Sequence, residues 1–296
     1  MSFSIQAMSA YVQRVFTRIP LLRAVRLWLD ADGLRMSAAM SFYGMLSLAP
    51  LLLLIVGLLG WWVDKAYLET NLIGQVQGVM GERGAEVVRA ALASAQAPEQ
   101  GRLASIAGFV LLLSGATGVF AELQSALERL WLHGHPAPER PAWWRMASLR
   151  LRGLAYVLAL GFLLLVSLVL STAIKVVATW ASALLPVGSG LLLQVINEAV
   201  SFGVVVLLFV GLMRIGSGPK PPLRCLVFGA AVGALLFTVG KQLLALYLTR
   251  AAVVSAYGAA GSLVVFLMWI YFSSAVLLFA ASCARALHDV RQVAPG

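Results

Sequence analysis

The stretch from Met36 to Val63 carries no charged side chain and contains one proline, Pro50, near its middle. A bilayer core about 30 Å thick needs about 20 helical residues, and a helix satisfies its own backbone polar groups in lipid. This stretch therefore predicts a transmembrane helix. Pro50 leaves the carbonyl of Leu46 without its usual donor and predicts a kink, with Ser47 as a local hydrogen-bonding substitute. We consider Ser47 and Pro50 a candidate hinge; the alternative is a static kink that only improves packing.

The composition extends this prediction to the whole chain. Hydrophobic residues make up 61% of the sequence and charged residues 11%, against about 25% charged residues in soluble globular domains. The class that fits is an integral membrane protein. The net charge of +10 does not indicate nucleic-acid binding, because the basic residues lie between apolar stretches and no nucleic-acid-binding motif accompanies them. Cys225 and Cys283 fall near the predicted inner ends of spans, so no structural disulfide is expected.

The apolar stretches predict an all-α bundle of six transmembrane helices within a membrane domain covering residues 34–290. The spans are expected at about 36–63, 103–132, 149–180, 191–214, 222–249 and 256–287. Residues 1–33 are expected to form interfacial helices, and 291–296 a short tail. Residues 64–102 predict an outer amphipathic helical segment, broken near Gly78, Gly81 and Gly84.

The distribution of basic residues predicts the orientation of these spans. Fifteen Lys and Arg residues lie in the two terminal regions and in the connections on their side, and five lie on the opposite side. Such an excess marks the cytoplasmic face. We therefore expect both termini in the cytoplasm.

Several polar side chains fall inside the predicted spans, where an ionisable group costs a few kcal/mol unless it faces protein or water. They are candidates for a polar cavity or substrate route: Glu122, Gln124, Gln194, Asn197, Glu198, Lys241 and Gln242. The alternative is that they form hydrogen bonds between helices that only fix packing. Lys241 is a candidate partner for Glu198 or for an anionic ligand. Small residues at Gly44, Gly118, Gly258 and Gly261 are candidate helix-packing positions.

The sequence does not favour an enzyme. His133 and His135 have only His288 as a further histidine, too few for a metal site of three or four ligands with these alone. No Gly-rich phosphate loop, paired carboxylate motif or nucleophile elbow is present. We expect no catalytic residue, no metal and no cofactor.

Four segments carry a resemblance to a known family. They are SAAMSFYGMLSLAPLLLL, GVFAELQSALERLW, GALLFTVGKQLLALYL and YGAAGSLVVFLMWIYFSSAVLLFAA, in this order. The chain resembles the YihY/virulence factor BrkB family of bacterial inner-membrane proteins, whose members were long labelled ribonuclease BN. The resemblance implies six membrane helices. Two departures are visible: Phe279, Ala280 and Ala281 stand where many members have Gly-Ala-Glu, and Glu128 stands where many have asparagine.

These observations lead to two functional hypotheses for a protein of the bacterial inner membrane. The first is a transporter or flippase-like protein for a lipid or another amphiphilic or anionic envelope substrate. The alternative is a non-transporting scaffold or an envelope-integrity (serum-resistance) factor. Membrane lipids are the expected partners and nucleic acid is not; a second copy or an envelope protein is left open.

Overall fold

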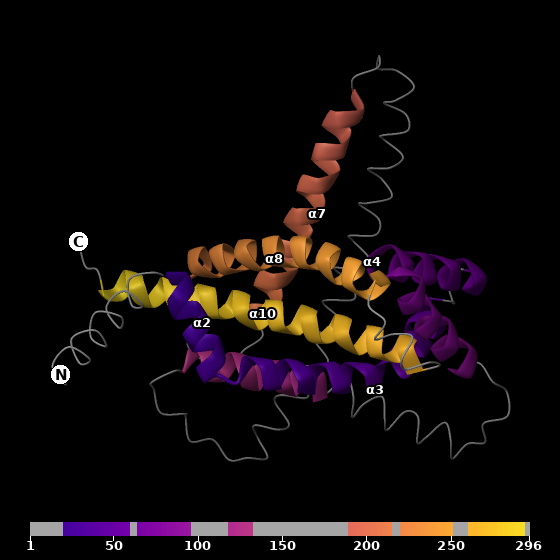
Figure 1. Cartoon of the computed structure of the whole chain (residues 1–296), viewed down its shortest axis with the longest axis horizontal. Coiled ribbons are helices and arrows are strands. Elements are labelled where there is room, and N and C mark those ends of the chain that lie inside the picture. Colours follow the sequence, from indigo (N-terminus) through magenta and orange to yellow (C-terminus); the bar gives the residue numbers. More distant parts are fainter. Residues whose placement is uncertain are drawn as a thin grey trace. The chain divides into compact units, whose positions relative to one another are not determined.

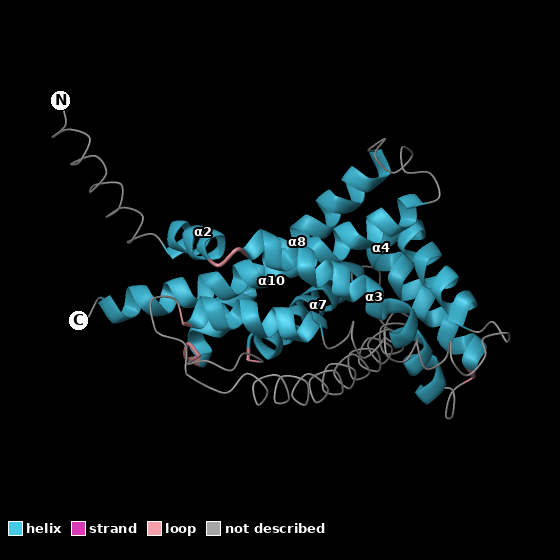
Figure 2. Cartoon of the chain, turned by 90° about the horizontal axis from the view of Figure 1, so that it is seen from below, coloured by secondary structure: helices cyan, strands magenta, loops and turns pink. Residues whose placement is uncertain are grey.

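The computed structural model describes residues 20–59, 64–95, 118–132, 189–214, 220–250 and 260–293. Every regular element in these ranges is helical, and Figure 2 shows no strand among them. The all-α class is thus confirmed for the described part. The predicted span 149–180 lies outside it, as do Gly258 and residues 1–19.

The described helices coincide with predicted apolar stretches, apart from the first and the third, which lie in the residue ranges 1–33 and 64–102. They are α2 (Pro20–Asp30), α3 (Gly33–Leu59), α4 (Lys65–Ala95), α7 (Ser189–Met213), α8 (Leu223–Arg250) and α10 (Gly261–Val293), and residues 118–131 are also helical. α2 begins at Pro20, a residue suited to the first turn of a helix because its missing N–H has no partner there. Pro50 lies within the continuous helix α3.

Two of the described helices are long and apolar enough to cross a membrane, by length and composition. They cover Leu223–Tyr247 in α8 and Gly261–Gln292 in α10, and a shorter apolar helix covers Glu198–Met213. The count of six spans and the orientation of the termini stay predictions. α10 continues to Val293, beyond the predicted end of the last span, and its final turns carry charged residues.

The chain divides into two compact units, each of which is described by itself. Unit 1 consists of Met1–Ala31, Leu127–Leu236 and Phe279–Gly296, and unit 2 of Asp32–Ala126 and Phe237–Leu278. Unit 1 therefore contains α2, α7, the first part of α8 up to Leu236 and the last part of α10 from Phe279. Unit 2 contains α3, α4 and the remaining parts of α8 and α10.

Unit 2 is assembled by close contacts of α3 with two other helices. A Cβ atom added at Gly44 would lie 3.2 Å from Ile270 of α10, and one added at Gly118 would lie 2.5 Å from the Tyr43 ring. Small residues of this kind let membrane helices approach closely. In Figure 1, α3 and the first part of α10 run alongside one another in opposite directions, and the helix 118–131 (magenta) also runs back along α3.

α4 is a helical hairpin and not a straight helix. Gly81 has φ 76° and ψ −179°, a conformation open almost only to glycine, and it is one of the three glycines at which the sequence predicted a break. Val88 and Leu92 after the break pack with Leu72 and Val76 before it, and Leu48 of α3 joins the same cluster. The hairpin therefore covers its own apolar face and part of α3.

Unit 1 is held by very close packing of α8 on α10. A Cβ atom at Gly229 would collide with the carbonyl oxygen of Ala280 and would lie 2.8 Å from Ala284 Cβ. At Gly233 an added Cβ would lie 2.5 Å from Ala280 Cβ and 2.7 Å from the Phe209 ring of α7. Glycine on α8 and alanine on α10 thus let the two backbones come together, with α7 packed beside them.

Candidate functional site

Buried polar side chains gather in unit 2, on three helices. Ser37 and Ser41 of α3, Gln124 of the helix 118–131 and Ser274 of α10 expose 0%, 7%, 1% and 6% of their surfaces. The Ser37 hydroxyl donates to the carbonyl of Gly33 over 2.7 Å, and the Ser41 hydroxyl to that of Ala38 over 2.8 Å. These two hydroxyl groups are therefore satisfied by their own helix.

Gln124 is different, because its side chain is buried without a partner. Neither the amide nitrogen nor the amide oxygen has a hydrogen-bond partner within the described ranges. The side chain is also among the largest fully buried ones of the described part. A buried polar group in this state calls for an explanation, such as a bound ligand or water.

Helix register places these four residues within about one helical turn of each other in depth, in unit 2. Gln124 follows Gly118 by six residues, and Ser37 precedes Tyr43 by six. Since Gly118 and Tyr43 are in contact and the helices run in opposite directions, Gln124 and Ser37 both lie about 9 Å beyond that contact toward the same end.

Ser41 and Ser274 lie in a similar relation about the contact of Gly44 with Ile270. Ser41 precedes Gly44 by three residues and Ser274 follows Ile270 by four, which places them about 4.5 Å and about 6 Å beyond the contact, toward that same end. We name Ser37, Ser41, Gln124 and Ser274 the polar layer. It crosses the interior of a unit whose other buried residues are mostly apolar.

The other predicted site residues are not all brought together. Glu122 and Lys241 are half-buried, whereas Glu198 and Gln242 are exposed. Glu198 belongs to unit 1 and Lys241 to unit 2, so their pairing stays a prediction. Ser47 is 7% exposed and donates to the carbonyl of Gly44 over 2.9 Å, and Gly261 is buried at the start of α10. For Gln194, Asn197 and Pro50 the structure describes the helical backbone only.

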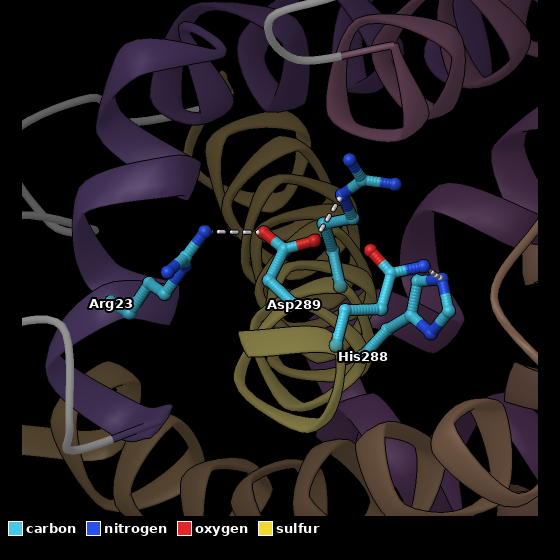
Figure 3. Close-up of polar contacts among 5 residues, drawn as sticks. Arg23, His288 and Asp289 are labelled. Carbon is cyan, nitrogen blue, oxygen red and sulfur yellow. Dashed lines mark hydrogen bonds and ion pairs between the residues drawn. The ribbon is translucent and has the colours of Figure 1, made fainter. Parts of the chain in front are cut away.

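Unit 1 contains a cluster of charged side chains where α2 meets the end of α10 (Figure 3). Arg23 Nη2 donates to Asp289 Oδ2 over 2.7 Å, and Arg285 Nε lies 3.0 Å from Asp289 Oδ1. The second contact is an ion pair whose N–H is not aligned on the oxygen. Asp289 is 9% exposed. His288 instead contacts Gln292, with 3.1 Å between the two nitrogen atoms. We name Arg23, Arg285 and Asp289 the arginine cluster.

Sequence reasoning did not find the arginine cluster. The spacing of Arg285 and Asp289 by four residues was a usable signal, since such residues face each other on a helix. No sequence signal connected Arg23 with Asp289, because 266 residues separate them.

The comparison with protein families covers nearly the whole chain. The family model of virulence factor BrkB matches residues 24–295. The chain belongs to the BrkB family. A UPF0761 membrane protein from Idiomarina loihiensis is 36% identical to it over 73 residues, which is 24% of this chain and 26% of the relative. The match thus spans about a quarter of that relative's length. No solved structure matches the chain.

The structure shows the surroundings of Ala281, at which the sequence analysis noted a departure from the family pattern. Ala281 is 0% exposed. Beside it, Ala280 packs against Gly229, and Phe279 meets Trp28 of α2. This BrkB-family chain therefore uses these positions of α10 for packing within unit 1.

Proposed function

We propose that this BrkB-family protein acts in the bacterial inner membrane as a transporter or flippase-like protein for a lipid or another amphiphilic or anionic envelope substrate. The observation that supports the proposal is the unpartnered amide of Gln124. Leaving a buried polar group without a hydrogen bond costs about 1–3 kcal/mol. A substrate headgroup or water reaching the polar layer offsets that cost, and an amide that donates and accepts suits such a passing group.

The proposal assigns no catalytic step, metal or cofactor to the protein, and membrane lipids are its partners. The alternative is a non-transporting scaffold or an envelope-integrity factor. In a scaffold, buried polar groups pair with one another across helices. Gln124 makes no such pair within the described ranges, and this favours transport.

A lipid-scrambling assay tests the proposal. The protein is reconstituted into vesicles of phosphatidylethanolamine and phosphatidylglycerol that contain a trace of either lipid with a fluorescent headgroup, and a membrane-impermeant quencher reports movement between leaflets. Wild-type protein is expected to accelerate the movement over protein-free vesicles. Gln124→Leu is expected to lower the accelerated rate at least about tenfold, because its apolar side chain cannot replace the polar partner in the route.

Gln75→Leu is the matched control, since it makes the same change at an exposed position of α4 that is not among the candidates for the route. It is expected to keep the wild-type rate. Size-exclusion chromatography before reconstitution establishes that each variant is folded. The proposal is contradicted if wild-type protein does not accelerate the movement of either lipid between leaflets. It is also contradicted if Gln124→Leu moves lipid as fast as wild type.

The assignment of Glu198 and Lys241 to the route has its own test. A variant with both residues replaced by alanine is expected to move lipid more slowly than wild type. If the double variant keeps the wild-type rate, these two side chains do not belong to the route, whereas the role of Gln124 is judged by its own variant.

A further inference from the structure

The arginine cluster carries an excess of positive charge at the edge of unit 1. Two guanidinium groups contact one carboxylate, so the cluster has a formal charge of +1. The side chain of Arg23 is 28% exposed and that of Arg285 is 12% exposed. Two guanidinium groups together offer ten N–H donors, more than the two oxygen atoms of Asp289 can accept. Donors and charge are therefore left for a further anion.

The amphipathic character of α2 identifies the class of that anion. Leu21, Val25 and Leu29 recur every four residues along one side of α2 and are 50%, 41% and 53% exposed. The other side of α2, with Ala24 and Leu27, is buried. An amphipathic helix with an apolar stripe and arginines lies in the membrane interface, with the stripe at the acyl chains. Arg23 lies about 160° around α2 from Val25 in the middle of this stripe, which places it on the headgroup side, where the anions are lipid phosphates.

We propose that the junction of α2 and α10 is a binding site for an anionic phospholipid in the leaflet at which α10 ends. Arg23 and Arg285 bind the phosphate on the side of α2 that faces α10, and the stripe of Leu21, Val25 and Leu29 on the opposite side holds α2 at the level of the headgroups. Arginine matches phosphate oxygens with paired N–H groups, and basic pockets beside membrane helices bind anionic headgroups. Asp289 orients both guanidinium groups when no lipid is bound and competes with the phosphate for them.

This role of Asp289 separates the proposal from a purely structural ion cluster. In a structural cluster, removing the carboxylate and removing an arginine change any measured property in the same direction, because each breaks the same contacts. In a lipid site the two changes have opposite effects on lipid affinity: loss of an arginine weakens binding, and loss of the competing carboxylate strengthens it. The proposal does not depend on lipid transport.

The experiment measures lipid affinity of the full-length protein by native mass spectrometry and by thermal stability in detergent, with phosphatidylglycerol, phosphatidylcholine and inorganic phosphate as separate probes. Phosphatidylglycerol is expected to bind wild type and raise its Tm, whereas the other two are not. Arg23→Gln and Arg285→Gln are each expected to weaken phosphatidylglycerol binding about tenfold, through lost charge-assisted hydrogen bonds. Asp289→Asn is expected to strengthen it.

Arg26→Gln is the matched control. Arg26 lies on the same helix, its side chain is 63% exposed, and its contact with Asp30 spans 3.8 Å. Arg26→Gln therefore removes the same charge outside the cluster. It is expected to keep wild-type affinity. Equal losses in Arg26→Gln and Arg23→Gln would indicate diffuse attraction and overturn the site, as would weaker binding in Asp289→Asn. A Tm rise with inorganic phosphate equal to that with phosphatidylglycerol would overturn the assignment to lipid.

Discussion

Trp28 of α2 meets Phe279 of α10 edge to face, with 6.1 Å between the ring centroids and 88° between the ring planes. Together with the hydrogen bond of Arg23 to Asp289, this contact fastens α2 to α10 at two points within unit 1. The Trp28 Nε1 atom is buried without a hydrogen-bond partner among the described residues. The ring itself, and not its N–H group, therefore makes the contact.

Replacing Trp28 tests whether the ring, and not the N–H group, makes this contact. Trp28 is half-buried, so Trp28→Ala is expected to lower the free energy of unfolding by about 1–3 kcal/mol, less than the loss at a fully buried tryptophan. Trp28→Phe keeps an aromatic edge and removes the unpartnered N–H, so we expect it to cost less than half as much. Unfolding by SDS in mixed micelles measures both. Equal losses in the two variants would show that the N–H group has a partner that matters.

The close approach of α8 to α10 predicts strong sensitivity at Gly229. Gly229→Ala places a Cβ atom 2.8 Å from Ala284 Cβ and 2.9 Å from the Ala284 nitrogen, so the helices must separate. Overpacking of this kind costs about 1–3 kcal/mol. Gly211→Ala on α7 is the control, because an added Cβ there meets nothing within 4 Å. It is expected to keep or raise the Tm, since alanine favours helix over glycine.

The bend of α4 depends on Gly81, and the distance between two spin labels on either side of Gly81 measures this bend. Any L-residue at φ 76° and ψ −179° costs about 1–3 kcal/mol, so Gly81→Ala is expected to open the hairpin. Spin labels at the exposed positions Thr70 and Ala90 measure this, because a straight helix would separate their Cα atoms by about 30 Å.

Gly78→Ala is the control for the α4 experiment, since Gly78 is helical and an added Cβ there meets nothing within 4 Å. It is expected to keep the short distance between the two labels. An unchanged distance in Gly81→Ala as well would mean that the packing of Val88 and Leu92 holds the hairpin without help from glycine.

Local signals predicted the helices and part of the site. Apolar length was enough to place α3, α8 and α10, and the glycines at 78, 81 and 84 marked the break in α4, because these properties act over a few neighbouring residues. Gln124 was likewise a candidate because it is a polar residue within a predicted span.

What the sequence could not predict depends on contacts between distant segments. Nothing local distinguishes Arg23 from Arg26, yet one contacts Asp289 of α10 and the other remains exposed. Similarly, Gln124 and Gln242 both lie in predicted spans, and only their neighbours in the fold make one buried and the other exposed. Which face of a membrane helix meets protein is decided by packing, and a single sequence contains little record of it.

The proposed role of Gln124 predicts that its removal stabilises the protein while it impairs transport. Gln124→Leu replaces an unpartnered buried amide by an apolar side chain of similar size, which removes a desolvation cost of about 1–3 kcal/mol. The free energy of unfolding in mixed micelles is therefore expected to rise, and the lipid-scrambling rate to fall. A site kept for function at the expense of stability behaves in this way. If Gln124→Leu instead lowers the unfolding free energy, the amide has a structural partner, and the polar layer is part of the packing of the bundle.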